Sequence, residues 1–526
     1  MMLATVLLTL ALVAVPGQTQ AQTVINLAGK PLHKLAMAEA AIRQLYVDSI
    51  GEDKLVEDAI RGMIQQLDPH SVYTSAKDVK ALTEPLEGGF EGIGIQYNMV
   101  EDTLVVIQPI SNGPSERMGI VAGDRIIFVN DSSIAGQKLT TEDIKRILRG
   151  PKGSKVKLGV MRQDVKGIHN FTVTRDKIPI YSIDAKYMID ATTGYIRINN
   201  FGATTHEEFI SAVHMLQDNG MVDLVLDLQG NGGGYLKAAV DISNEFLEAG
   251  DLIVYTDGRA QSKVQYFANG KGLVRSGKVV VLVDSYTASA SEIVSGAIQD
   301  NDRGVIVGRR TFAKGLVQRQ VDLPDGSMIR LTTAHYYSPS GRCIQKPYEK
   351  GKRGDYDRDL VSRLNSGELT NADSIHFPDS LKFTTLKRHR VVYGGGGIMP
   401  DVYVPLDTTE VTPLHRELLA KSCINNTNLK YADKNRKRLK KQYKTFEDFR
   451  DRFEVDDDMI ALLKEYADKA KVEYTDSTLA EALPMIKVQL KSLLARDIWD
   501  TNEYYQLINT INDIYCEGVK QVGKKD

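Results

Sequence analysis

The chain has no excess of charge of either sign. Its 526 residues carry a formal net charge of −2, which gives no electrostatic basis for a nucleic-acid partner. Charged residues make up 25% and hydrophobic residues 42% of the sequence, proportions that are ordinary for a folded protein with a sizeable core. The length predicts about three or four domains.

Cysteines are few, and long hydrophobic runs are missing beyond the N-terminus. Cys343, Cys423 and Cys516 are far apart, so the sequence shows neither a disulfide framework nor a metal-ligand spacing. One disulfide in an oxidising compartment stays open. No segment after the N-terminal run is apolar enough to cross a membrane, and we therefore expect no transmembrane span in the mature protein.

The N-terminus has the pattern of a signal peptide. An apolar run from Met1 to Val15 precedes small and polar residues, and Thr19 and Ala21 suit the two small-residue positions of a signal-peptidase site. We predict a signal peptide over residues 1–21 and export to the periplasm or cell envelope. No Lys or Arg precedes the run, so an N-terminal membrane anchor and a buried helix stay open as alternatives.

Hydrophobic spacing divides the rest of the chain into segments of different class. Apolar residues at helical spacing predict an N-terminal helical region over 22–84, and short β-like runs predict a small β domain over 85–176. An α/β region spans 177–405: continuous apolar strands alternate with helices over 193–310, as in a sheet covered by helices on both faces, and β patterns return over 315–337. A polar, irregular insertion interrupts this α/β region at 346–390. A charged helical region follows over 406–526.

The segment KNRKRLKKQYK, residues 434–444, is strongly basic. It fits the solvated face of a helix in the C-terminal region. An anionic partner is the open alternative.

Serines crowd the stretch DSYTASASEIVSGAIQD, residues 284–300, between an apolar strand and a helix. Ser289 and Glu292 match a capping box, in which the hydroxyl accepts from the backbone amide three residues on and the carboxylate reaches back. A serine at a strand-to-helix turn also suits a nucleophile, because the amides and dipole of the helix N-terminus can stabilise an oxyanion. The two roles do not exclude each other.

A serine nucleophile needs a base, and the histidines do not supply one. None of the nine histidines sits in a recognisable triad context, and His70, His206 and His214 are interpreted as structural residues. Lys314 lies among apolar residues in RTFAKGLVQ, and burial would lower its pKa toward neutrality. A side chain that reaches solvent instead is the open alternative.

The stretch LDLQGNGGGYL, residues 226–236, is a glycine-rich loop between a strand and a helix. It lacks the Lys-Ser/Thr pair of a P-loop and the dinucleotide-binding fingerprint. Such a loop can bring backbone amides close to a ligand. A simple tight turn explains it equally well.

Taken together, these stretches resemble the C-terminal processing peptidases, the tail-specific serine proteases of peptidase family S41. The matching stretches are, in chain order, LDPHSVYTS, GFEGIGI, GDRIIFVN, LRGPKGSKV, LDLQGNGGG, SYTASASEIVSGAIQD, GRRTFAKGLVQ, YYSPSGRCIQ and GIMPDVYVP. They cover roughly residues 35–405. The resemblance implies an α/β protease core of the crotonase/ClpP-like type with an inserted PDZ β domain and helical terminal regions.

The resemblance assigns catalytic roles to a serine and a lysine. The family's nucleophile, the middle serine of S-A-S-A-S-E, falls on Ser289, and its base, the lysine of T-F-G-K-G, falls on Lys314. A glutamine four residues after the lysine, here Gln318, positions it in the family. The resemblance calls for neither a metal nor an organic cofactor.

The family's oxyanion donors are backbone amides. They fall on Gly233 and on Ala290, the residue after the nucleophile, with Gly234 as the open alternative to Gly233. Three other positions depart from the family's pattern without removing a catalytic group. They are Ala313 and Gln229, where the family has glycine and arginine, and Gly232, where it has proline.

The β domain resembles a PDZ module that binds polypeptide substrates by their C-termini. Its carboxylate-binding loop would be Phe90, Glu91, Gly92, Ile93, Gly94 and Ile95, with the bound tail adding a strand to the sheet edge. The arginine of the family's R-G-x-x-G motif, here Arg149, is implicated in sensing the peptide and coupling the module to the active site. Taken alone, the loop also fits a glycine-rich turn.

The sequence thus predicts an exported serine endopeptidase with a Ser-Lys dyad. A catalytically inactive PDZ adaptor that binds protein C-termini is the alternative from another class. An acyl-CoA-type enzyme on a similar α/β core is a third reading, which the PDZ-like module disfavours. A homodimer through the helical ends is open by family analogy.

Overall fold

The structure, a computed structural model, describes residues 30–162, 165–407 and 411–524. The chain forms two compact units, residues 1–64 and 65–526. The predicted signal peptide at residues 1–21 lies outside the described residues.

The smaller unit contains helix α1 (Lys30–Leu45) and nearly all of helix α2 (Glu52–Gln65). Both form where apolar residues recur at helical spacing, which confirms helices in this region. An ion pair joins Arg43 Nη1 to Glu52 Oε2 at 2.7 Å. Both side chains are largely exposed, so this pair contributes at most about 1 kcal/mol.

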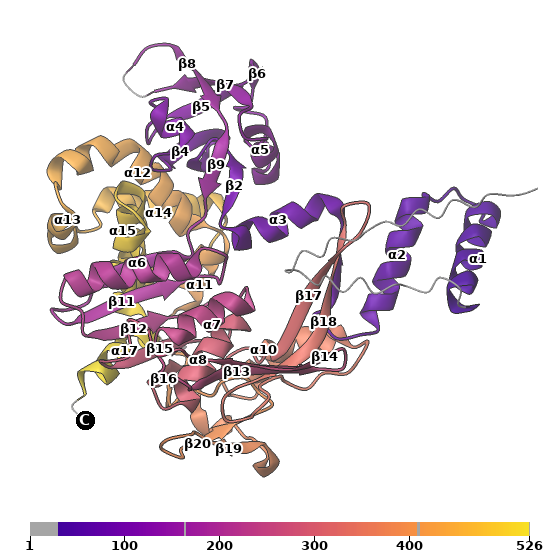
Figure 1. The fold of residues 1–526 in the computed structure, drawn as a ribbon. Helices are drawn as coiled ribbons and strands as arrows, with labels where there is room; N and C mark the ends of the chain where they lie inside the picture. Colours follow the sequence, from indigo (N-terminus) through magenta and orange to yellow (C-terminus); the bar gives the residue numbers. More distant parts are fainter. Residues whose placement is uncertain (1–29, 163–164, 408–410, 525–526) are drawn as a thin grey trace, which may run out of the picture. The chain divides into compact units, whose positions relative to one another are not determined.

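A six-stranded sheet forms the centre of the larger unit (Figure 1). Its strands are, in spatial order, β10 (Ile183–Met188), β11 (Thr193–Ile198), β12 (Asp223–Asp227), β15 (Val279–Val283), β16 (Val305–Gly308) and β21 (Val402–Tyr403). Neighbours from β11 to β21 pair in parallel, while β10 pairs antiparallel to β11. The carboxyl ends of the parallel strands therefore meet at one edge, where ligand sites of α/β proteins form.

Helices cover both faces of this sheet. They are α6 (Thr205–Asp218), α7 (Leu236–Asn244) and α8 (Ala290–Asp300) on one face and α17 (Asp513–Gly523) on the other. Neighbouring strand residues point to opposite faces: Val281 packs against α6 to α8, and Val280 packs against α17. Each such buried residue contributes about 1.5–3 kcal/mol. The continuous apolar strands of the sequence are explained by this double cover, and the predicted α/β core is confirmed.

A second, five-stranded sheet flanks the first. Its strands are β1 (Val72–Thr74), β13 (Leu252–Gly258), β14 (Gln261–Phe267), β17 (Leu316–Asp322) and β18 (Met328–Tyr337). β17 and β18 form a hairpin, and β1 pairs with the other side of β18. This places residues 72–74 beside residues 328–330 of the hairpin, although they lie far apart in the sequence.

The β domain follows helix α3 (Ala76–Glu87). Its sheet has the order β3 (Ile95–Val100), β4 (Thr103–Pro109), β5 (Arg125–Val129), β7 (Lys155–Met161) and β8 (Ile168–Thr174), with β6 (Ser132–Ser133) beside β5. Helices α4 (Pro114–Arg117) and α5 (Thr141–Leu148) complete it, and the ribbon of β2 (Gly89–Gly92) and β9 (Asp176–Pro179) frames it. A capping box of Thr140 and Asp143 starts α5, and its apolar side faces the domain core through Ile144 and Leu148.

The insertion at 346–390 is more ordered than the sequence predicts. It contains α9 (Arg353–Asp357), α10 (Asp359–Asn365), two 3₁₀ turns (Ala372–Ser374 and Asp379–Leu381) and β19 (Lys382–Thr384), which pairs with β20 (Val391–Tyr393). Arg363 Nε and Arg310 Nε each donate to Glu368 at 2.6 Å, and all three side chains are largely buried. The polar composition therefore reflects buried ion pairs as well as exposure, and the expectation of an irregular loop is wrong here.

The C-terminal region is helical, as predicted. Its helices are α11 (Pro413–Ala420), α12 (Cys423–Gln442), α13 (Phe446–Arg452), α14 (Asp457–Lys469), α15 (Asp476–Ile498) and α16 (Thr501–Ile508), which lead through a 3₁₀ turn (Asn509–Ile511) into α17. In the basic segment 434–444, Leu439 is buried and Lys441 is exposed, so the helix has one packed and one solvated side. Of the helices described, none combines the length and hydrophobicity that a membrane crossing requires.

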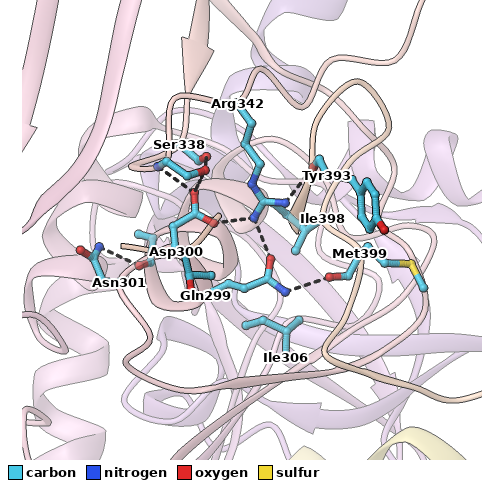
Figure 2. A network of polar contacts seen from close by, with 12 residues as sticks. Gln299, Asp300, Asn301, Ile306, Ser338, Arg342, Tyr393, Ile398 and Met399 are labelled. Carbon is cyan, nitrogen blue, oxygen red and sulfur yellow. Dashed lines mark hydrogen bonds and ion pairs between the residues drawn. The ribbon is translucent and has the colours of Figure 1, made fainter. Parts of the chain in front are cut away.

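A buried polar network fixes the C-terminal end of α8 (Figure 2). Arg342 Nη2 donates to Asp300 Oδ1 and to Gln299 Oε1, both at 2.7 Å. Arg342 Nη1 donates to the Tyr393 carbonyl at 2.8 Å, and Gln299 Nε2 donates to the Met399 carbonyl at 2.9 Å. The network thereby joins α8 to two loops and orients the helix whose other end lies at the site described below.

We predict that Asp300→Ala lowers the free energy of unfolding by about 3–5 kcal/mol, because it leaves the Arg342 guanidinium buried without its charge partner. Both side chains of this pair are fully buried. Urea unfolding followed by circular dichroism measures the change. Glu465→Ala, which removes the exposed Lys469–Glu465 pair, is the control and should change the free energy of unfolding by less than about 1 kcal/mol. Equal effects of the two substitutions would contradict the structural role of the network.

Candidate active site

A cleft of about 350 Å³ opens near the carboxyl ends of β12 and β15. All the predicted catalytic and oxyanion residues line it: Gly233, Gly234, Ser289, Ala290, Lys314 and Gln318. Leu82 and Leu86 of α3 supply part of an apolar wall. The cleft thus brings together α3, the glycine-rich loop, the start of α8, the loop that contains Lys314 and the β17–β18 hairpin.

The four serines of the stretch 284–300 have different surroundings. Ser289 lines the cleft and is half-buried. The Ser291 hydroxyl is fully buried and donates to the Asn231 carbonyl at 3.0 Å, and the Ser295 hydroxyl donates to the Ser291 carbonyl at 2.9 Å. Ser285 is buried outside the cleft lining. Ser289 is therefore the serine of this stretch that can meet a ligand in the cleft.

The backbone at Ser289 is strained. Strand β15 ends at Val283, and the chain turns so sharply into α8 that Ser289 has φ 58° and ψ −114°. A residue with a side chain rarely adopts a positive φ, and such strain persists only where the surroundings enforce it. The turn presents the Ser289 side chain at the start of the helix, where the first backbone amides lack intrahelical acceptors.

The Glu292 carboxylate enforces this turn. Its Oε2 accepts from the Ser289 amide at 2.7 Å and from the Lys314 amide at 2.9 Å. Its Oε1 accepts from the Thr311 hydroxyl at 2.5 Å and from the Ala313 amide at 2.8 Å. One side chain therefore ties the serine turn to the lysine loop. The predicted reach of Glu292 back to Ser289 is present, but the bonds to the lysine loop were not foreseen.

Ala313, which stands where the family has glycine, has an unusual backbone conformation. Ala313 has φ 75° and is fully buried, so it adopts the left-handed conformation in which glycine is favoured. The Glu292 carboxylate accepts from its amide in this conformation. The loop thus retains a glycine-like backbone with an alanine in it.

The Lys314 ammonium is directed by a glutamine. Lys314 Nζ donates to Gln318 Oε1 at 2.9 Å, and Gln318 Nε2 donates to the His70 carbonyl at 2.6 Å. Among the described residues, no hydrogen bond joins Lys314 Nζ to the Ser289 hydroxyl, although both side chains line the same cleft. The arrangement leaves the lysine oriented by Gln318 in the cleft that Ser289 also lines.

The turn that contains His70 is built by Asp68, which the sequence analysis did not single out. Asp68 Oδ1 accepts from the amides of His70 and Ser71 at 2.9 and 3.0 Å and from the Thr332 hydroxyl at 2.8 Å. Asp68 therefore fixes the carbonyl that orients Gln318. The Asp68 side chain accepts from the amide two residues on, that of His70, as in an Asx turn, and an Asp at this position of a turn is the signal that could have found it.

The glycine-rich loop approaches the serine turn closely. A Cβ on Gly233 would lie 2.8 Å from the Ser289 Cβ and 2.9 Å from the Ala290 nitrogen, so only glycine fits. The Gly233 amide donates to Asn231 Oδ1 at 2.8 Å. The Gly234 amide has no acceptor among the residues that the structure describes. In this conformation Gly234, rather than Gly233, has an amide available to a ligand.

Burial changes the pKa of both central groups. It lowers the pKa of Lys314 to about 8, and the positive charge of Arg330 acts in the same direction. Burial raises the pKa of Glu292, against four donated hydrogen bonds that lower it. Three of the four partners of this carboxylate are backbone amides, which can only donate and therefore favour the ionised form, while the Thr311 hydroxyl can also accept. We therefore treat Glu292 as ionised.

The predicted carboxylate-binding loop lies at a second groove, in the β domain. Phe90, Ile93, Gly94 and Ile95 line this groove together with Arg149. The Arg149 guanidinium lies 4.4 Å from the centre of the Phe90 ring, and its Nη1 donates to Glu84 of α3. Arg149 thus contacts both the loop and the helix that lines the cleft. Glu91 and Gly92 belong to β2.

Four family models match the chain. Peptidase family S41 matches residues 192–356, and the PDZ domain matches residues 92–174. The N-terminal domain of the activating protease CtpB matches residues 12–78, and a family of unknown function (DUF8443) matches residues 414–500. The expected protease core and inserted PDZ domain are confirmed by these matches.

Known proteases are similar over most of their length. The chain is 37% identical over 309 residues to the carboxy-terminal-processing protease of Bartonella bacilliformis, and this match covers 58% of this chain and 70% of that protein. The chain is also 34% identical over 336 residues to the carboxy-terminal processing protease CtpB of Bacillus subtilis, and this match covers 63% of this chain and 69% of that protein. The solved photosystem II D1 C-terminal processing protease is 26% identical with a TM-score of 0.35, and the match covers 70% of this chain and 92% of that chain.

We predict that Glu292→Gln lowers the free energy of unfolding by about 2–4 kcal/mol, because its amide group points new donors at existing donors in a buried site. Differential scanning fluorimetry and urea unfolding measure the loss. Glu207→Gln, at an exposed position on α6, is the matched control and should change stability by less than about 0.5 kcal/mol. If Glu292→Gln leaves the free energy of unfolding unchanged, the four hydrogen bonds do not fix the site.

Proposed function

Because the chain belongs to peptidase family S41, the family of the carboxy-terminal processing proteases, we propose that it cleaves polypeptides with Ser289 as nucleophile and Lys314 as general base. The observation that supports the proposal is a cleft lined both by Ser289 and by a partly buried lysine of lowered pKa, which Gln318 orients. The adaptor alternative would require neither the lowered lysine pKa nor the strained serine turn.

In the proposed reaction, neutral Lys314 accepts the Ser289 hydroxyl proton while Ser289 Oγ attacks the substrate carbonyl carbon. The resulting ammonium then protonates the leaving amine, and an acyl-enzyme remains. A water molecule attacks the ester carbon as Lys314 accepts its proton, and Lys314 then passes this proton to Ser289 Oγ as the ester bond breaks and the carboxyl product leaves. Gln318 accepts from the lysine nitrogen and keeps it directed into the cleft. The chain's own residues supply each proton transfer.

Backbone amides stabilise the tetrahedral oxyanion in this proposal. The Ala290 amide at the start of α8 is one donor, supported by the orientation of the helix dipole. The predicted second donor, Gly233, can serve after its bond to Asn231 opens, and the Gly234 amide is available without that change. Each such donor accounts for about 10²–10³-fold in rate.

The PDZ domain provides the substrate-capture step. Its groove combines a loop of backbone amides with apolar side chains, which suits the carboxylate and side chain at the end of a polypeptide. Arg149 links this groove to α3 through Glu84, and α3 lines the active-site cleft. We infer that occupation of the groove by a chain end is sensed through this contact.

Export completes the proposal. The N-terminal apolar run with small residues before position 22 supports a cleaved signal peptide, and we place the enzyme in the periplasm or cell envelope. The homodimer stays a prediction.

We predict that Ser289→Ala abolishes cleavage of an unfolded protein with an apolar C-terminus, while Ser291→Ala retains activity within about tenfold of the unchanged enzyme. Within the described part of the chain, the Ser291 hydroxyl bonds to the Asn231 carbonyl alone, a contribution of about 1 kcal/mol. Mass spectrometry of new chain ends measures cleavage, and circular dichroism checks the fold of both variants. An equal loss at Ser291 would overturn the assignment of the nucleophile.

We predict that kcat/KM rises about tenfold per pH unit below pH 8 and levels off above it, because only the neutral amine of Lys314 accepts a proton and its pKa is lowered to about 8. Arg330→Gln removes a positive charge that lowers this pKa, so the rising limb should move to higher pH. Arg319→Gln, an exposed change on the same hairpin, should leave the profile unchanged. A profile that is flat from pH 5 to 10 would exclude Lys314 as the base.

A further inference from the structure

Strand β3 forms the outer edge of the PDZ sheet. The order of the sheet begins with β3, which pairs with β4 on its inner side. Helix α5 runs along the outer side and lines a groove with β3 through Thr141, Lys145 and Leu148. An extended chain can add to such an edge by main-chain hydrogen bonds.

The loop before β3 aims backbone amides at this groove. The Ile93 carbonyl accepts from the amide and hydroxyl of Ser115 at 3.1 and 2.7 Å, and the Gly94 carbonyl accepts from the Ile110 amide at 3.0 Å. In a trans peptide the N–H points away from the carbonyl, so the amides of Gly94 and Ile95 face the opposite, groove side. A terminal carboxylate would bind there, and the rest of the tail would run along β3.

The side chains of β3 alternate between two faces. Ile95, Tyr97 and Met99 pack on the domain core that α5 covers. A strand added to this edge follows the same alternation. Its last residue, and the residue two before it, would face α5. The residues one and three before the end would face the other side of the sheet.

Helix α12 of the C-terminal region covers that other side. Leu429 of α12 packs against Val100 at the end of β3 and against Val105 and Ile107 of β4. The contact is apolar and buried, so α12 forms a packed wall on the face of the sheet that α5 does not cover.

Two ion pairs fix the direction of α12 across the sheet. Lys430 Nζ lies 2.5 Å from Glu101 Oε1 at the turn between β3 and β4. Further along the helix, Asp433 pairs with Arg125 of β5. The helix therefore runs from the β3 edge inward, and its first turn lies at the edge itself.

The first turn of α12 lines the groove with polar side chains. Ser422, Asn425 and Asn426 border it together with β3. Asn425 is exposed and Asn426 is half-buried. Neither carboxamide is hydrogen-bonded to another residue in the described part of the chain. Each offers two donors and one acceptor.

We propose that α12 is the second wall of the tail-binding groove, and that Asn425 and Asn426 select the side chain three residues before the carboxyl end of the bound polypeptide. The inference rests on the proposed capture of tails by the PDZ domain. The C-terminal helices then take part in the choice of substrate. Helix α5 contacts the last residue of the bound tail and the residue two before it, and α12 contacts the residues one and three before the end. Polar side chains three residues from the end are favoured.

A change of charge at Asn425 tests the proposal in the full chain with Ser289→Ala, which prevents cleavage. The probes are fluorescent peptides of about eight residues with a free carboxylate and an apolar last residue, carrying Lys or Glu three residues before the end. Fluorescence anisotropy gives the Kd. With Asn425→Asp, we expect the Lys peptide to bind about threefold tighter and the Glu peptide about threefold weaker; Asn425→Lys should reverse both shifts.

Two controls separate position from general charge. Asn435→Asp makes the same change on α12 outside the groove and should leave both peptides unaffected. Peptides with Lys or Glu two residues before the end should not respond to Asn425→Asp, since that side chain faces α5. Equal responses at the two peptide positions, or none at either, would overturn the role of α12.

The outcome for the unchanged Asn425 chain distinguishes the two proposals. If this chain binds free-carboxylate peptides but not their amidated forms, tail capture is supported, and an unresponsive Asn425→Asp then refutes α12 selection alone. If it binds neither form, or both equally, the proposed capture of chain ends fails, and the inference on α12 fails with it.

Discussion

The buried Glu292 carboxylate is the contact on which the rest of the site depends. Desolvation of a charge is unfavourable by several kcal/mol, and here four charge-assisted hydrogen bonds offset it. Because the donors come from both the serine turn and the lysine loop, one ionised group fixes the relative position of two elements. Ser289 and Lys314 keep their places in the cleft only while that carboxylate is in place.

The strain in the site is consistent with this constraint. Ser289 and Ala313 both adopt positive φ angles, and both donate their amides to Glu292. There is a strained turn at each end of the contact, and Arg342 and Asp300 fix the far end of α8. Ser289 therefore lies in a rigid frame. The Lys314 side chain is less constrained. Gln318 orients its ammonium group, and the turn that Asp68 builds at His70 orients Gln318.

The sheet and its cover could be predicted from the sequence, because buried parallel strands leave continuous apolar runs such as Val279–Val283. Ser289 and Lys314 came from the family resemblance, since a capping box and a solvated lysine explain the local residues equally well. The contacts of Asp68 with Thr332 and of α12 with β3 could not be predicted, because they join residues more than 260 positions apart or more than 320 apart. The order within the insertion could not be predicted, because buried ion pairs and exposed polar loops have the same composition.

The central claim is that Lys314 activates Ser289 and no other serine. Mass-spectrometric mapping of the residue modified by a fluorophosphonate tests it most directly, because that reagent captures activated serines. If Lys314 activates Ser289, a single adduct forms on Ser289 and is lost in the Lys314→Met variant, whose fold is intact. An adduct on another serine, or equal labelling of Ser289 without the lysine, would contradict it.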